Sequence, residues 1–463
     1  MTTSMSTTIS SLDDLQALAD RVVALVHDLG AAQDGEVEAN VRVSRTRHGL
    51  TRFANSFIHQ HVGEDSVEVA LTLALDGRTT SASTTRIGEE ELAELVRTAL
   101  ASAALQPVDP GWPGATPPGE ASFVGNHDQA TAAASPDERA EGVEAFVAAE
   151  PGFEAAGYLD TEATWTAFAS TAGQRIAGSA TRATIDGIHR SATSAGSAHQ
   201  TSTRLGELDA AAAGARAARL ARDGQDPIDL APGTYPVVLG PEAAATLLTF
   251  LAVYGFNAKS YLDGGSFVRL GEQQLDPSLT LWQDPTDPRV VALPFDAEGT
   301  PHTRYPLIEE GVPRQLAHDR RTAKRFGDDA VSTGDALPFG AGFGAVPTSM
   351  VLTPGERSPE ELVAGIERGL LVTSFNYVRV LEPKAVSATG LTRNGTFLIE
   401  DGEVTRPVSN LRFTQGFVAA LAPGQVLGIG NDDRYADGEF GAGVVITPSL
   451  ALAAWAFTGG AQG

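Results

Sequence analysis

Two runs of alternating apolar residues constrain the fold of this chain most. They cover residues 37–43 and 67–75, and every second residue in each run is Val, Ala or Leu. Such a period of two is typical of strands with one buried and one solvated face, and the Asp76-Gly77 pair that ends the second run suits a hairpin turn. The two runs therefore predict an antiparallel sheet.

Amphipathic helices flank these runs. Ser11 can cap a helix in which Leu and Val recur at the 3.6-residue period until Gly30 stops it. A second pattern of the same period covers residues 92–103. We therefore predict an α+β fold that begins with an N-terminal domain over residues 1–105, in which helices form a layer on the antiparallel sheet.

Two segments rich in Pro, Gly and Asp divide the remainder of the chain. Residues 106–120 and 223–233 can continue neither a helix nor a strand, and we place boundaries there. Between them we expect a middle segment over residues 120–222. It contains a capping box from Ser135 to Glu138, strand-like runs and an Ala-rich helix.

We predict a third unit over the last part of the chain, residues 234–463. A strand at residues 235–239 feeds a helix that starts at Pro241, and many short apolar runs broken by Gly, Pro and Asp follow. One further amphipathic helix is predicted from Ser358 through Leu370. This pattern favours a mostly-β, barrel-like C-terminal domain.

The charge of the chain limits its partners. A formal charge of -25 and a pI near 4.7 oppose binding to nucleic acid or to an anionic membrane. The basic cluster from Arg314 to Arg325 is interpreted as a solvated helix face. Residues 1–11 lack a signal pattern and no apolar run approaches the roughly 18 residues of a membrane span, which predicts a cytoplasmic protein.

The chain contains no cysteine, which excludes disulfides, thiolate nucleophiles and Cys-ligated metal sites. Any metal would need His and carboxylate ligands. His59 and His61 could join Glu64 or Asp65 as such ligands, but two polar residues on the wet face of a sheet explain the pair better.

Three other histidines receive structural interpretations. His189 and His199 lie in a segment of small residues without a periodic carboxylate partner, and we expect them to have surface or packing roles. His318 and Asp319 are interpreted as a solvated pair rather than a catalytic dyad.

A glycine-rich segment near residue 340 allows two interpretations. Phe339, Gly340, Gly342 and Phe343 belong to a run that lacks the Lys-Ser/Thr of a phosphate loop and the helix pattern of a dinucleotide loop. A flexible loop is the plainer interpretation, and an extended wall of a peptide groove is the alternative.

Short phrases in a fixed order resemble the TldD/TldE family, also called TldD/PmbA, of paired bacterial proteins in which one subunit is a zinc metallopeptidase. Each phrase is unspecific alone, and the order of all of them carries the resemblance. They are Thr51–Ser56, Asp296–Thr300, Leu307–Val312, Arg321–Lys324, Ser332–Gly334, Arg368–Val372, Gly395–Glu403 and Gly430–Asp432.

The resemblance also implies which branch of the family this chain joins. In the catalytic branch, the helix after the first C-terminal strand carries His-Glu-x-x-x-His and a Cys near the chain end is a further zinc ligand. Here Thr249, Phe250 and Tyr254 stand at the motif positions, and the motif occurs nowhere in the chain. Thr and Tyr hydroxyls are poor zinc ligands, and Phe cannot act as a general base.

We therefore expect a TldE/PmbA-like chain with no catalytic residue, metal or cofactor of its own, and with the apolar face of that helix in the core. Its expected partners are a zinc-bearing TldD-like subunit and an unfolded or precursor peptide, and a homodimer of the isolated chain is an open alternative. Two other functions stay open: a stand-alone hydrolase with an unassigned site, and a scaffold or regulatory binding protein.

Overall fold

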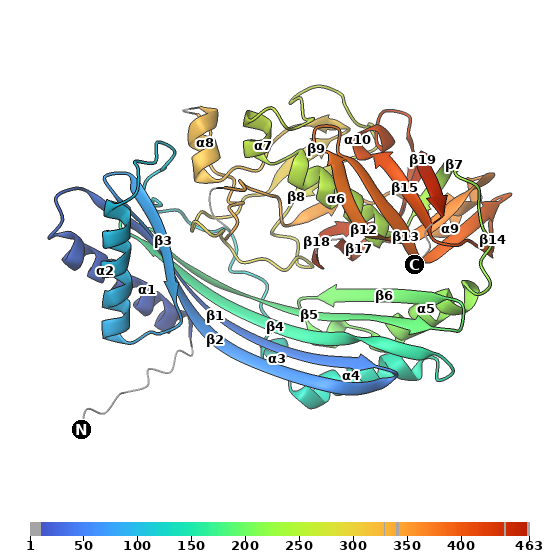
Figure 1. Ribbon diagram of the computed structural model, residues 1–463, viewed down its shortest axis with the longest axis horizontal. Helices are drawn as coiled ribbons and strands as arrows, with labels where there is room; N and C mark the ends of the chain where they lie inside the picture. Colours follow the sequence, from blue (N-terminus) through green and yellow to red (C-terminus); the bar gives the residue numbers. More distant parts are fainter. Residues whose placement is uncertain (1–10, 328, 339–341, 439–440, 461–463) are drawn as a thin grey trace.

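The computed structural model describes residues 11–327, 329–338, 342–438 and 441–460. Its N-terminal half is built on one long, curved antiparallel sheet with the strand order β3-β2-β1-β4-β5-β6 (Figure 1). Strands of the predicted N-terminal domain and of the predicted middle segment thus share a single sheet. The six strands are β1 Val37–Ala54, β2 Phe57–Leu75, β3 Arg78–Thr84, β4 Glu154–Ser170, β5 Arg175–Arg190 and β6 Ala195–Ser202.

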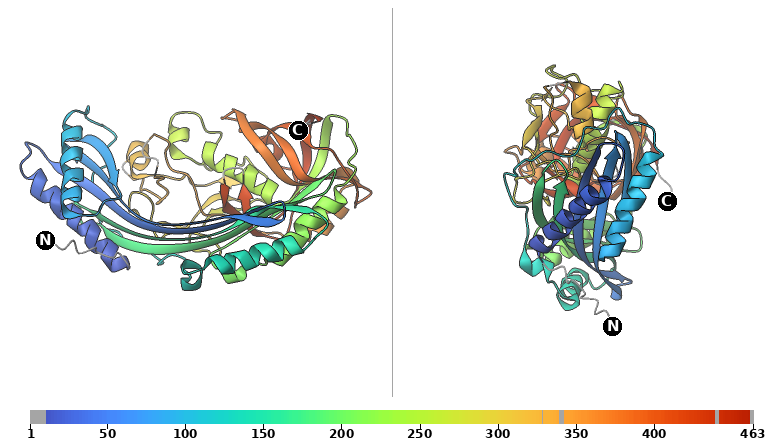
Figure 2. Two further views of the ribbon diagram at one scale, coloured as in Figure 1. Left: turned by 60° about the horizontal axis from the view of Figure 1, so that its bottom comes forward. Right: turned by 90° about the vertical axis from the view of Figure 1, so that its left-hand side faces the viewer.

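Helices cover the convex face of this sheet (Figures 1 and 2). Alternate strand residues such as Val41, Leu71 and Ala167 are buried under α1 and α2, whereas Phe53 and Ile185 are buried under α4 and α5. Capping boxes at Ser11 and Ser135 start α1 and α4, as their sequences predict. The helices are α1 Leu12–Gly30, α2 Glu89–Ala104, α3 Gln129–Ala132, α4 Pro136–Ala148, α5 Ala210–Asp223 and the 3-10 turn η1 Leu205–Glu207.

The C-terminal half contains a closed five-stranded barrel. Neighbours pair in the order β12-β7-β19-β15-β13, and pairing of β13 with β12 closes the ring. Helix α6 (Pro241–Tyr254) packs into the same core as the barrel strands. The barrel strands are β7 Gly233–Leu239, β12 Arg368–Glu382, β13 Ser387–Glu400, β15 Leu411–Gly416 and β19 Leu450–Gly460, with β14 Glu403–Pro407 and β16 Val426–Ile429 attached.

A second six-stranded sheet, with the order β10-β9-β8-β11-β18-β17, completes this half. The predicted α+β fold with a barrel-like C-terminal domain is confirmed. The strands are β8 Leu281–Gln283, β9 Tyr305–Glu309, β10 Val312–Pro313, β11 Met350–Leu352, β17 Arg434–Gly438 and β18 Gly441–Thr447, and the remaining helices are α7 Ala258–Leu262, α8 Arg320–Phe326, α9 Pro359–Ala364 and α10 Phe417–Ala420.

The helix predicted from Ser358 through Leu370 is shorter than its apolar spacing suggests. It ends at Ala364, and Leu370 already lies within β12, where it is fully buried. Leu370 pairs with Val237 in the parallel ladder of β7 and β12. Pairing in the barrel therefore overrides the local helical period.

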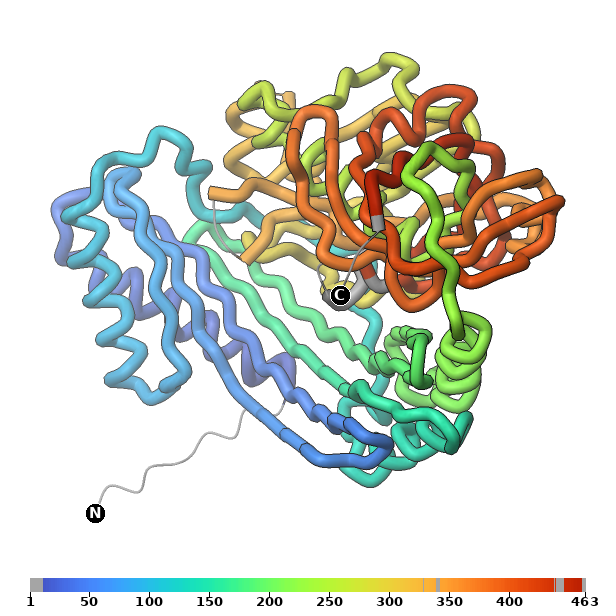
Figure 3. Tube along the Cα trace, turned by 45° about the vertical axis from the view of Figure 1, so that its right-hand side comes forward, coloured from blue at the N-terminus to red at the C-terminus, as the bar shows by residue number. Residues whose placement is uncertain are grey.

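The C-terminal half lies over the concave face of the long sheet (Figures 1 and 2), and residues 224–232 lead to it from α5 at one end of that sheet (Figure 3). Near the other end, the basic cluster on α8 holds the Pro- and Gly-rich segment. Arg320 donates to the carbonyl oxygens of Gly114 (2.6 Å) and Ala115 (3.1 Å), and Lys324 donates to that of Trp112 (2.7 Å).

The interpretation of this cluster as a solvated face therefore holds for Arg314, Lys324 and Arg325, which are exposed, and is wrong for Arg320 and Arg321. Arg321 also pairs with Asp109 across the two halves, at 2.5 Å, and holds the pKa of that carboxyl at about 2. Within the described residues, no helix is long and apolar enough to cross a membrane.

The barrel core is built around Trp455, which is fully buried. Its ring stacks on Phe375 with centroids 5.1 Å apart and on Phe417 at 5.6 Å, and Phe413 meets it edge-on at 5.3 Å. Because truncation leaves a cavity among these rings, Trp455→Ala should lower the free energy of unfolding by about 3–5 kcal/mol. Urea titration followed by circular dichroism measures this loss.

The control is Leu381→Ala, because Leu381 belongs to β12 of the same barrel and is 60% exposed. This change should cost less than about 0.5 kcal/mol. Equal stabilities of the two variants would contradict the assigned core.

Candidate functional site

The three positions that correspond to the zinc motif of the catalytic branch lie on α6, and their side chains pack against neighbouring residues. Phe250 is fully buried, stacks on Tyr254 with centroids 6.1 Å apart and meets Phe417 edge-on at 6.0 Å. Thr249 is buried, and its hydroxyl has no hydrogen-bond partner among the described residues. These three side chains offer neither an imidazole nor a carboxylate to a metal ion.

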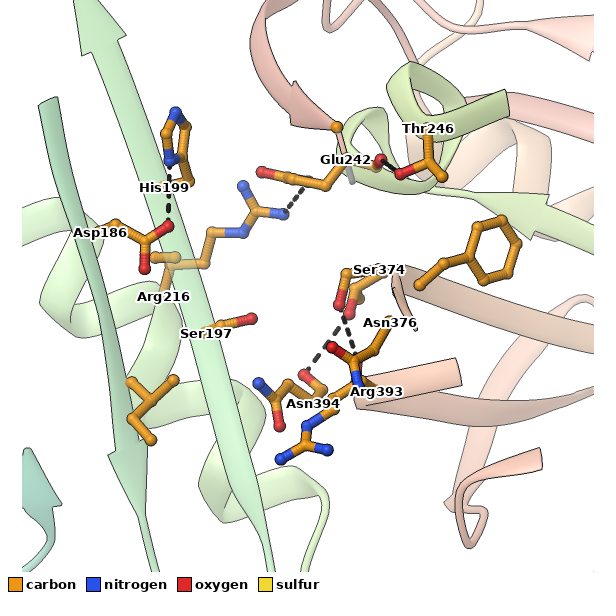
Figure 4. A pocket seen from close by; sticks show the side chains of 15 residues that line it. Asp186, Ser197, His199, Arg216, Glu242, Thr246, Ser374, Asn376, Arg393 and Asn394 are labelled. Atoms are coloured by element: carbon orange, nitrogen blue, oxygen red, sulfur yellow. Dashed lines mark hydrogen bonds and ion pairs between the residues drawn. The ribbon is translucent and has the colours of Figure 1, made fainter. Parts of the chain in front are cut away.

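A cavity of about 300 Å³ opens beside the N-terminal turns of α6, between β5 and β6 of the long sheet and β12 and β13 of the barrel (Figure 4). A Cβ placed on Gly438, which lines the cavity, would be 3.1 Å from the Thr249 hydroxyl oxygen. Thr249 therefore lies next to Gly438, but it does not itself line the cavity. Its lining is mostly polar and includes Asp186, Ser197, His199, Arg216, Glu242, Thr246, Ser374, Asn376, Arg393 and Asn394.

A largely buried carboxylate and two partly exposed arginines form an ion-pair network in one wall of this cavity. The Glu242 carboxylate lies 2.6 Å from a guanidinium nitrogen of Arg434 on β17 and 3.3 Å from one of Arg216 on α5. Burial alone would raise the pKa of Glu242, but Arg434 and Arg216 outweigh it and hold this pKa below its ordinary value. One carboxylate therefore neutralises one of two guanidinium groups and joins the two halves of the molecule.

Irregular backbone shapes the opposite wall. Strand β12 changes register between Val372 and Ser374 and again between Asn376 and Arg379. Tyr377 and Asn394 both have φ = 54°, in the left-handed region that bulky residues rarely adopt. Bulges of this kind re-aim side chains and occur frequently at functional sites, and here they flank Asn376 and Asn394 at the cavity.

His59 and His61, with Glu64 and Asp65, do not form a metal site in this structure. Nδ1 of His61 is hydrogen-bonded to the Thr51 hydroxyl at 3.0 Å. Its Nε2 lies 3.4 Å from the Arg139 guanidinium, whose positive charge would repel a metal cation at this position. The strand changes register at His59, whereas Asp65 is bound by Arg45 at 2.7 Å. In the part of the chain that the structure describes, no three His, Asp or Glu side chains form a group able to hold a metal.

The other histidines divide between the core and the cavity. His189 is fully buried, stacks on Phe146 with centroids 5.2 Å apart and bonds to its carbonyl oxygen at 3.0 Å, a packing role. His199 lines the cavity instead. Its Nδ1 lies 3.1 Å from the Asp186 carboxylate and its Nε2 2.9 Å from the Thr201 hydroxyl.

The interpretation of His318 and Asp319 as a solvated pair is wrong, because both residues are buried. Asp319 is the N-cap of α8 and accepts from the backbone N–H of Thr322 at 2.6 Å. His318 packs edge-on against Phe326, with centroids 5.0 Å apart.

The glycine-rich segment is only partly described. Phe339 and Gly340 lie outside the described residues. Phe343 is 49% exposed, and its carbonyl oxygen accepts a hydrogen bond from Asn257 at 2.9 Å. Phe343 and Gly342 do not line the cavity beside α6, and a peptide groove at this segment remains a prediction.

A second buried carboxyl lies in another cavity between the two halves, lined by Arg182 and His302. Asp335 accepts hydrogen bonds from Tyr305 (2.6 Å), Thr333 (2.5 Å) and Gln283 (2.8 Å). Burial raises the pKa of Asp335 to about 7, although these three hydrogen bonds counteract it. In the sequence, only its place next to the Ser332–Gly334 phrase points to this carboxyl.

Known proteins share this architecture. Residues 232–459 match the family model described as the PmbA/TldA metallopeptidase C-terminal domain. A metalloprotease from Methanothermobacter thermautotrophicus is 26% identical over 215 residues, which are 45% of each chain. Matches to such curated relatives span less than half of each relative's own length.

Two solved structures share the fold over nearly the whole chain. TldE from Thermococcus kodakarensis superposes with a TM-score of 0.85 at 20% identity, covering 95% of this chain and 100% of that one. A Thermotoga maritima protein described as a proposed modulator of a DNA gyrase gives a TM-score of 0.81 at 21% identity, covering 96% and 100%.

The long sheet and the closed barrel define a two-part architecture, and its C-terminal half matches a family model described as metallopeptidase. The family model and the order of the sequence phrases agree on its relationship. The chain belongs to the TldD/TldE family.

Glu242→Gln should destabilise the protein strongly. It removes the negative charge between Arg434 and Arg216 while keeping the side-chain shape, so it leaves guanidinium charge uncompensated. The expected loss in free energy of unfolding is about 1.5–3 kcal/mol, the range for hydrogen bonds to charged groups, because both arginines stay partly exposed; urea titration measures it. In Glu272→Gln, which breaks an exposed pair with Arg269, the loss should stay below about 1 kcal/mol. Equal losses would show that the network does not hold the two halves.

Asp335 should make stability fall as the pH rises toward neutrality. The unfolded carboxyl ionises near 3.8, whereas the folded one keeps its proton up to about pH 7. Between these values the folded state binds one more proton, so the group lowers the free energy of unfolding by about 1.4 kcal/mol per pH unit. Asp335→Asn should lack this slope in urea titrations at pH 5, 6 and 7. Parallel pH dependences of variant and wild type would refute the raised pKa.

Proposed function

We propose that this chain is the non-catalytic, TldE-like subunit of a heteromeric zinc metallopeptidase that acts on unfolded or precursor peptides in the cytoplasm. The observation that supports the proposal is which side chains stand at the motif positions of α6. Where the catalytic branch has its two His and one Glu, this chain has Thr249, Phe250 and Tyr254, and Phe250 is packed between two other rings. Zinc and the attacking water then belong to the partner subunit.

The polar concave face of the sheet supports a role in holding substrate. Alternate residues of β1, β4 and β5 on that face, such as Arg42, Glu162 and Arg182, line the cavities between the two halves. Polar walls of this kind suit peptide backbones, whose N–H and C=O groups need hydrogen-bond partners when they leave water. In the proposed complex these walls help to enclose the peptide that the partner cleaves.

The purified chain should contain no stoichiometric zinc and hydrolyse no unfolded peptide, because it lacks a ligand set on α6. Activity should appear when it is mixed with a zinc-bearing TldD-like homologue from the same genome. Elemental analysis measures the metal, and release of new amino termini from an unfolded peptide measures the activity. A partner whose motif histidines are replaced by Ala serves as the control and should leave the mixture inactive. One zinc ion per isolated chain would overturn the proposal.

A second candidate, a stand-alone hydrolase, is favoured by one observation. The Thr201 hydroxyl, His199 ring and Asp186 carboxylate form a hydrogen-bonded chain in the order that activates hydroxyl nucleophiles, and the last two line the cavity. The Thr201 hydroxyl is also bonded to Thr184 at 2.9 Å, which competes for it. Hydrolysis by the isolated chain that disappears in His199→Ala would establish this candidate, and an inactive isolated chain would dismiss it.

A further inference from the structure

The cavity beside α6 contains hydrogen-bonding groups that the fold does not use. Among the described residues, the side chains of Asn376, Arg393, Asn394 and Ser197 have no hydrogen-bond or ion-pair partner, although all four line the cavity. The first three come from β12 and β13 of the barrel, and Ser197 comes from β6 of the sheet on the opposite side (Figure 4). When polar side chains without partners line the same cavity, they indicate a binding site for a polar ligand.

The charge around the cavity favours an anion. Arg216, Arg434 and Arg393 carry three positive charges. Glu242 and Asp186 carry two negative charges, which leaves one positive charge in excess. The carboxylate of Asp186 is engaged by His199 at 3.1 Å. This surplus of cations stands out in a chain with a formal charge of -25, and it is held where a ligand has access.

The backbone holds these donors in place. The second bulge of β12 lies directly after Asn376, and Asn394 itself has φ = 54°. The Ser374 hydroxyl donates to the Arg393 carbonyl oxygen at 2.7 Å, which ties the two strands together at the cavity. A guanidinium beside two amides in such a frame matches the planar oxygens of a carboxylate.

We propose that this cavity binds the C-terminal carboxylate of a peptide, with Arg393 as its charged anchor and with Asn376 and Asn394 as additional donors. The inference rests on the proposed function, since it takes the ligand to be a peptide, and it gives this subunit a role in positioning substrate by its chain end. Ser197 on the sheet side then faces the last peptide groups.

The test compares two probes on the full-length chain. One is a short, unstructured peptide with a fluorophore at its amino terminus and a free carboxyl terminus, and the other is the same peptide as its C-terminal amide. Fluorescence anisotropy should show that the free acid binds about tenfold more tightly, because a charge-assisted hydrogen bond is lost in the amide. In Arg393→Gln the preference should fall below about threefold.

Arg412→Gln is the matched control, because this substitution changes the net charge by the same amount. Arg412 is an exposed barrel residue that does not line the cavity. It should keep the tenfold preference. Inorganic phosphate should displace the free-acid peptide only at much higher concentration, and displacement at equal concentration would overturn the peptide assignment.

Equal binding of acid and amide, or an undiminished preference in Arg393→Gln, would also overturn this inference. Those results would leave the zinc content and the dependence on a partner unaffected, so failure here is distinct from failure of the proposed function.

Discussion

Two guanidinium groups on one buried carboxylate hold the functional region together. Glu242 stands in the first turn of α6, and its partners come from α5 of the sheet half and β17 of the barrel half. Paired and hydrogen-bonded charges are tolerated inside proteins only in good geometry, so this network fixes how the halves meet. The cavity walls follow from it, because β6 and the bulged β12 face each other across the same junction.

Several of the arginines in this acidic chain form hydrogen bonds and ion pairs that connect its two halves. It has 33 Lys and Arg residues against 58 Asp and Glu. Arg320 and Arg321 on α8 bind the segment between the halves, and Arg216 and Arg434 bind Glu242. Each of these groups binds carbonyl or carboxylate oxygens of the chain itself, which explains why a cationic cluster in the sequence does not become a basic surface.

Aromatic and apolar side chains fill the part of α6 at which the resemblance places the zinc motif of the catalytic branch. A stack of Phe250 and Tyr254 against Phe417 fills the region with dispersion contacts and apolar burial. The Thr249 hydroxyl is buried without a hydrogen-bond partner among the described residues, which lowers the stability of the folded state. In the proposed complex, such a chain contributes binding surface while its partner contributes the chemistry.

Local patterns in the amino-acid sequence were enough to predict several helices and strands and the family relationship. Alternation in residues 37–43 and 67–75 predicted strands that the structure has. A cap at Ser11 and a capping box at Ser135 predicted the starts of α1 and α4, and the residues at the motif positions were read from the sequence directly. The folded chain was needed to show where Arg216, Glu242 and Arg434 meet, that Leu370 belongs to a strand, and that Arg320 of α8 binds the segment between the halves. These outcomes depend on long-range pairing and desolvation, and neither leaves a periodic signal along the chain.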